Sequence, residues 1–120
     1  MGRENAMLTI ERLNEYGANT KEGLERCVNM PDFYLRLVGT LAKDEHLAQM
    51  KKAVEAGDLA AGFEAAHALK GVLANLALTP VLKPVSELTE HLRARTEMDY
   101  TPLLAEAEQE MNKLLEIINE

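Results

Sequence analysis

The segment DLAAGFEAAHALKGVLANLAL, residues 58–78, decides the fold because its apolar residues repeat with the period of an α-helix. Successive helical residues are rotated by about 100°, which places several of them on one stripe, spaced like a seam between packed helices. The stripe consists of Leu59, Ala66, Leu69, Leu73 and Leu76. Asp58 can cap the helix through its carboxylate, and the pattern predicts a helix over residues 59–78.

The face of this helix that carries His67 lies well away from the apolar stripe. It carries unusually few long side chains. The residues on the His67 side are Ala60, Phe63, Glu64, Lys70, Gly71, Ala74 and Leu78. An ordinary solvated helix face carries more long charged side chains than this. We therefore expect the surface around His67 to be open to a partner.

Gly71 and Lys70 are the two neighbours that give His67 a possible chemistry. A glycine inside a helix costs about 1 kcal/mol relative to alanine, and Gly71, four residues after His67, leaves space beside the imidazole. Lys70 lies three residues after His67, so its ammonium can reach an anion on the ring. Neutral imidazole is a nucleophile, and phosphoryl transfer needs in-line approach and charge neutralisation. The three residues therefore suit the acceptance of a phosphoryl group.

The rest of the chain also predicts helices, separated by capping residues, glycines and prolines. The expected pieces are a short helix from Thr9 to Gly17, a second over 21–28, one from Pro31 through Leu41, one between Asp44 and Gly57, one after Thr79-Pro80 and a last one after Thr101-Pro102. Pro84 requires either that its helix begins near this residue or that the first turn is kinked. Short connections favour an all-α, up-and-down antiparallel four-helix bundle with additional short N-terminal helices.

Composition and charge limit the class of protein. The chain has 120 residues, 47% of them hydrophobic, with 2 Phe, 3 Tyr and no Trp, so its core is aliphatic and suits helices. The net charge of −7 argues against nucleic acid and against an anionic membrane surface. Cys27, the single cysteine, cannot form an intramolecular disulfide. We expect one cytoplasmic domain over residues 8–120, preceded by a disordered leader or expression remnant at 1–7.

The run AHALKG at residues 66–71 resembles the signature of histidine-containing phosphotransfer (HPt) domains, in which His-x-x-Lys-Gly marks the phosphorylated helix. Further similar stretches are Asn75-Leu76, Leu78-Thr79, and the N-terminal runs GLERC at 23–27 and DFYL at 32–35. The resemblance extends over about residues 8–118. Val72, Leu73 and Ala77 depart from the common pattern, which usually has smaller residues at the first two positions and glycine at the third.

By this resemblance His67 would be phosphorylated, Lys70 would stabilise the phosphate and Gly71 would admit the partner's active site. The protein would be a monomeric carrier without cofactors rather than an enzyme. Its partners would be response-regulator receiver domains, which supply Mg²⁺ and the acceptor aspartate, and a hybrid sensor histidine kinase. The expected docking residues are Ala60, Phe63, Glu64, Ala74, Asn75 and Leu78. Phe63 could equally lie at the edge of the core.

Metal binding and protein binding are the two alternatives to phosphotransfer. The pair Glu64-x-x-His67 matches half of a di-iron bundle motif, which needs a second Glu-x-x-His pair. His46 and His91 have Lys43 and Leu88, not glutamate, three residues before them. The second pair is therefore missing, and no metal site is expected. No nucleotide-binding motif is present either. The alternative is a non-catalytic helical protein-interaction module. A phosphorylated receiver separates the two, since only a carrier takes up its phosphoryl group.

Overall fold

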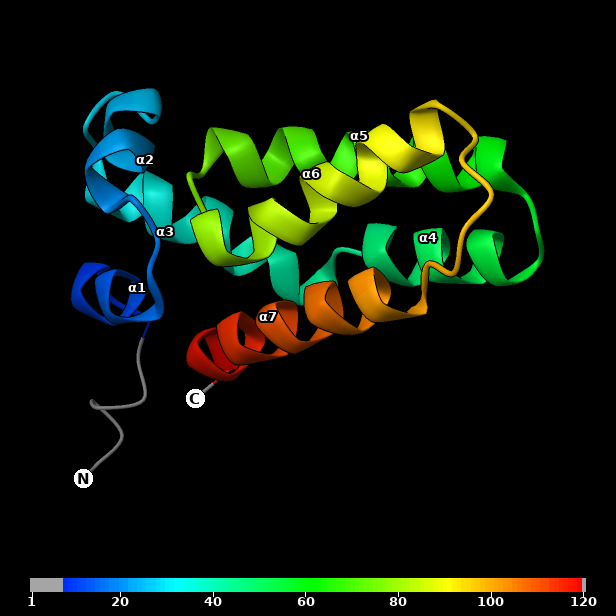
Figure 1. The fold of residues 1–120 in the computed structure, drawn as a ribbon. Helices are drawn as coiled ribbons and strands as arrows, with labels where there is room; N and C mark the ends of the chain where they lie inside the picture. The colour runs from blue at the N-terminus through cyan, green and yellow to red at the C-terminus, as the bar shows by residue number, and fades with distance from the viewer. Residues whose placement is uncertain (1–7, 120) are drawn as a thin grey trace.

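The computed structural model describes residues 8–119 as a succession of helices with no strand among these residues (Figure 1). The elements are α1 (Ile10–Tyr16), α2 (Thr20–Arg26), α3 (Pro31–Gly39), a 3-10 turn η2 (Thr40–Lys43), α4 (His46–Glu55), α5 (Leu59–Asn75), α6 (Thr79–Arg93) and α7 (Thr101–Asn119). The leader expected at 1–7 lies outside the described residues. None of the described helices is long and apolar enough to cross a membrane.

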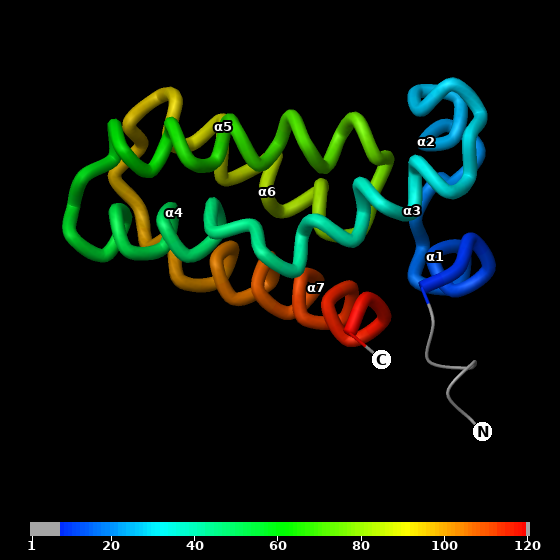
Figure 2. Tube along the Cα trace, turned by 180° about the vertical axis from the view of Figure 1, so that it is seen from behind, coloured from blue at the N-terminus to red at the C-terminus, as the bar shows by residue number. Residues whose placement is uncertain are grey.

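Helices α4 to α7 form an up-and-down bundle. Helix α4 packs on α5, α5 on α6 and α6 on α7, and each runs opposite to the one before it (Figures 1 and 2). The short helices α1 to α3 gather at one end, where α1 packs against α7. This arrangement confirms the predicted four-helix bundle with additional N-terminal helices.

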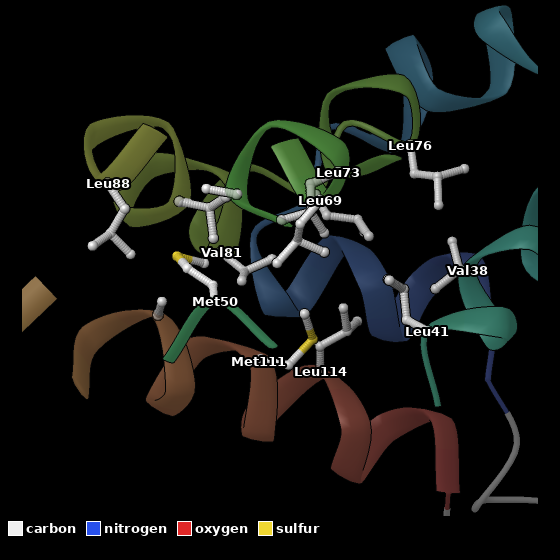
Figure 3. Packing of buried hydrophobic residues seen from close by; sticks show 14 of the residues in the cluster. Val38, Leu41, Met50, Leu69, Leu73, Leu76, Val81, Leu88, Met111 and Leu114 are labelled. Carbon is white, nitrogen blue, oxygen red and sulfur yellow. The ribbon is translucent and has the colours of Figure 1, made fainter. Parts of the chain in front are cut away.

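The core lies between the four bundle helices, extends to α1, α3 and η2, and is almost entirely aliphatic (Figure 3). The labelled core residues are Val38, Leu41, Met50, Leu69, Leu73, Leu76, Val81, Leu88, Met111 and Leu114. On α5, Ala66, Leu69 and Leu73 of the predicted stripe are at 0% exposure, whereas Leu59 is half-buried. Leu76, the last residue of the stripe, is buried just after the helix ends. Burial of a leucine side chain contributes about 2 kcal/mol, so this stripe fixes which face of α5 points outward.

The ends of α5 show where local chemistry decides the helix. Asp58 Oδ1 accepts a hydrogen bond from the Ala61 backbone N–H at 3.0 Å, as expected of a cap. The predicted end at Leu78 is wrong, because Ala77 takes the left-handed conformation with φ of 55° and the helix stops at Asn75. The Leu78 N–H then bonds to Leu73 O at 3.0 Å, which closes the turn. This conformation favours glycine, the residue usual at the Ala77 position in the family that the sequence resembles.

Several other predicted boundaries shift by a few residues. Helix α2 ends at Arg26 rather than at residue 28, where φ is positive, and α3 gives way to η2 before Leu41. Helix α6 begins at Thr79, so Thr79 is not its cap. The helix also runs through the buried Pro84, which excludes a start near that proline.

Tyr34 of α3 ties the N-terminal helices to the end of α5. Its hydroxyl donates a hydrogen bond to Leu76 O at 2.9 Å in a fully buried setting. Burial, with a smaller contribution from nearby Cys27, raises the pKa of Tyr34 to about 12, so the phenol remains a donor at neutral pH. Leu73 belongs to the same core, and Val72 packs against it. Both residues depart from the pattern of the family that the sequence resembles.

Tyr34→Phe is expected to lower the free energy of unfolding by about 1–3 kcal/mol, because the buried Leu76 carbonyl loses its donor. Urea denaturation measures the change. Tyr100→Phe is the matched control, since the Tyr100 hydroxyl donates to Thr96 O at 2.8 Å within its own loop and is only partly buried. Equal losses in the two variants would contradict a special role for the Tyr34 contact.

Candidate functional site

His67 lies halfway along α5 on the exposed face, opposite the buried stripe. Within residues 8–119 it forms no hydrogen bond or ion pair, and its one ring contact is with Phe63, one turn earlier. The two ring centroids are 5.4 Å apart and the planes are inclined by 31°. The imidazole nitrogens are therefore not engaged by other described side chains, as an outward-facing nucleophile requires.

Gly71 leaves open space one turn after His67. A Cβ atom built on Gly71 would meet no atom within 4 Å. Gly62 on the same helix differs, because its Cβ would lie 3.1 Å from Val54 Cγ2 and 3.4 Å from Leu92 Cδ2. Gly62 is thus needed for close helix packing, whereas packing gives no reason for a glycine at position 71.

Lys70 is half-buried and does not extend freely into solvent. Its Nζ atom lies 3.5 Å from Oε2 of Glu90, a residue of α6. The ion pair joins the two helices beside the site, and it is exposed enough that its net contribution to stability is small. The ammonium is near His67 in sequence but has a carboxylate partner already.

Glu90 and Arg93 of α6 and Arg95, which follows that helix, complete the surroundings of the site, and no sequence motif pointed to them. Glu90 also contacts Arg93, with Nε 3.3 Å from Oε1 and Nη2 3.4 Å from Oε2. This hydrogen-bonded Arg93, followed by the charge of Lys70, holds the pKa of the Glu90 carboxyl below its usual value. The guanidinium carbons of Arg93 and Arg95 lie 4.9 Å and 5.8 Å from the centroid of the Phe63 ring.

Three cationic side chains, from α5, α6 and the turn after α6, give the site a local charge opposite to that of the whole chain. The protein carries a net charge of −7, yet Lys70, Arg93 and Arg95 gather beside Phe63 and Glu90. Cations over the face of an aromatic ring are attracted to its π electrons, which keeps the guanidinium groups on this side of α5. The arrangement can attract an anion to the neighbourhood of His67.

The expected docking residues differ in how far they are exposed to solvent. Ala60, Glu64 and Asn75 are exposed, whereas Ala74 and Phe63 are half-buried. Phe63 combines the two predicted roles, because it packs against the core while its ring contacts His67.

Leu78 is a correction to the predicted docking set. Its side chain is 0% exposed, so it cannot contact a partner. The assignment extended the 100° rotation of α5 beyond its real end at Asn75. Because the left-handed Ala77 turns the chain, Leu78 points into the core and precedes α6 instead of lying on the His67 face.

The other two histidines lie on the two helices that pack against α5, His46 on α4 and His91 on α6. His46 Nδ1 is 2.9 Å and 3.0 Å from the two carboxylate oxygens of Asp44, which engage that ring at the start of α4. His91 is half-buried on α6. Among the residues that the structure describes, no three His, Cys, Asp or Glu side chains come together as a set of metal ligands.

Comparison with models of protein families places much of the chain in a known family. The model of a family described as the Hpt domain matches residues 43–117, from the end of η2 to near the end of α7. The matched span contains His67, Lys70 and Gly71 together with the α6 residues around them. Searches of curated proteins and of solved structures each found no match.

Proposed function

Because the chain belongs to the Hpt domain family, we propose that it is a phosphorelay protein that carries a phosphoryl group on His67. The observation that supports this most is the exposed imidazole of His67 beside the open space at Gly71. The partners in this proposal are receiver domains of response regulators and a hybrid sensor histidine kinase, which the protein would meet in the cytoplasm. Family members are phosphoryl carriers rather than enzymes.

The proposed transfer uses the outward nitrogen Nε2 of His67 as the nucleophile. Its lone pair attacks the phosphorus of a phosphorylated receiver aspartate, while the ring proton resides on Nδ1. A P–N bond forms as the P–O bond breaks, and the aspartate carboxylate leaves with the bonding electron pair. The reverse reaction passes the group to the next receiver. Both directions need the reacting atoms in line, which the absent side chain at Gly71 permits.

The receiver would supply the magnesium ion and the acceptor aspartate, so this chain needs only to present His67 and to stabilise the product. Lys70 is the residue proposed to stabilise it. Its ammonium lies one turn from the imidazole, and a charge-assisted contact with the phosphoryl oxygens is within the reach of a lysine side chain.

Lys70→Ala is expected to slow transfer or to shorten the lifetime of the phosphohistidine. The change should leave the free energy of unfolding within about 0.5 kcal/mol, because surface substitutions seldom do more. Time courses of transfer and of label decay measure the effect. Lys83→Ala on the exposed face of α6 is the control that removes an equal charge elsewhere. Wild-type rates and lifetimes in Lys70→Ala would assign Lys70 no part in the reaction.

The proposal as a whole is tested by incubating the protein with a receiver labelled on its aspartate. A carrier takes up the label as an acid-labile, alkali-stable phosphoramidate. A helical protein-interaction module binds partners without taking up label. Binding of receivers without any transfer would therefore favour that alternative.

A further inference from the structure

Among the residues that the structure describes, Glu90 is the one carboxylate that contacts Lys70, and the proposed transfer chemistry gives it no role. Lys70 is in turn the only Lys or Arg of α5. We infer that Glu90 competes with the phosphoryl group for Lys70 and thereby limits the lifetime of phospho-His67. The inference rests on the proposed function and adds a positioning residue to it, one that acts through Lys70.

Lys70 lies where its ammonium can bind either Glu90 or a phosphoryl group on His67. Its Nζ is 3.5 Å from Glu90 Oε2, with the two side chains 35% and 57% exposed. An ammonium on a flexible four-carbon stem can turn toward a second anion nearby. A phosphoryl group on His67, one turn away, would bring such an anion with close to two negative charges. Lys70 must then exchange one partner for the other.

Arg93 makes this exchange possible at little cost. It contacts both oxygens of Glu90 from the next turn of α6, at 3.3 Å and 3.4 Å, and so remains its partner when Lys70 leaves. Glu90 is therefore not stranded as an uncompensated charge. The Arg93 contact also fixes the carboxylate on the Lys70 side of α6, where it can recapture the ammonium when the phosphoryl group departs.

The test measures phosphohistidine lifetime in the absence of any receiver. Phosphoramidate serves as the donor: Nε2 of His67 attacks phosphorus, the P–N bond of the donor breaks, and ammonia leaves. After removal of the donor, ³¹P NMR follows hydrolysis. Glu90→Gln should lengthen the half-life by about two- to five-fold, the range expected for loss of one exposed competing ion pair. Glu87→Gln, one turn earlier and without an ion pair within residues 8–119, should leave it unchanged.

A double-mutant cycle identifies the route of the effect. If Glu90 acts through Lys70, Glu90→Gln should have no effect in a Lys70→Ala background. An equal lengthening in both backgrounds would mean simple repulsion between Glu90 and the phosphoryl group and would overturn the inference. Glu90→Ala provides a second variant, and thermal melts verify that both are folded.

The role of Glu90 and phosphotransfer on His67 are contradicted by different results. Equal half-lives of wild type and Glu90→Gln, each loaded on His67, would overturn the role of Glu90 and leave phosphotransfer standing. Absence of transfer from any receiver to wild-type His67 would overturn the proposed function, whatever the half-lives after chemical loading.

Discussion

His67→Gln is expected to abolish uptake of the phosphoryl group from a phosphorylated receiver while the bundle stays folded. Glutamine has an amide in place of the imidazole and cannot form a stable phosphoramidate. The substituted side chain is exposed and loses only the ring contact with Phe63, so stability should change by no more than about 0.5 kcal/mol. The measurement is a label-transfer time course beside a thermal melt of the same sample.

His46→Gln and His91→Gln are the matched controls and should accept label at the wild-type rate. The first histidine is engaged by Asp44, and the second is half-buried on α6. The label on wild type should be lost in acid and kept in alkali, as expected for a phosphoramidate on Nε2. Label on His67→Gln, or loss of label in either control, would show that the phosphorylated residue has been misassigned.

The fold was largely predictable because its helices are marked by strong local signals. The stripe through Ala66, Leu69 and Leu73 needs only the period of the helix, and the cap at Asp58 needs only its own carboxylate. The end of α5 could not be predicted in the same way. A left-handed alanine at position 77 breaks no hydrophobic pattern, and that backbone conformation carried Leu78 into the core.

The candidate site also has a part that could be predicted from the sequence and a part that could not. His67, Lys70 and Gly71 belong to one helix, so their i, i+3 and i+4 spacing was enough to predict them as neighbours. Glu90 and Arg93 come from α6 and Arg95 from the turn that follows it, so their approach depends on how α6 is packed against α5. Charges near a helix C-terminus are common in any case, so the sequence did not distinguish these three from ordinary solvated residues.

Substitutions of Gly71 are expected to affect stability and phosphotransfer in opposite directions. Because a Cβ here would meet no atom within 4 Å, Gly71→Ala should raise the free energy of unfolding by about 0.5–1 kcal/mol. The same change at Gly62 introduces a Cβ 3.1 Å from Val54 Cγ2 and should not give this gain. A thermal melt of the two variants compares an open glycine with a packed one on the same helix.

Gly71→Gln should then fold at least as well as wild type and be severely impaired in transfer. Glutamine is a good helix former, and the position is exposed, so nothing in the bundle opposes it. Its side chain would nevertheless stand beside His67, where donor and acceptor atoms must approach in line, and a displacement of about 1 Å can cost a factor of about 10² in rate. Thermal melts and transfer time courses on the same samples measure both properties.

Gly39→Gln on α3 is the control for this substitution, because a Cβ at Gly39 also meets no atom within 4 Å and that residue lies on another helix. It should leave transfer unchanged. An unfolded Gly71→Gln would mean that the glycine serves packing after all. A folded Gly71→Gln with normal transfer would mean that the open space beside His67 has no role, and the observation that best supports phosphotransfer at this face would be lost.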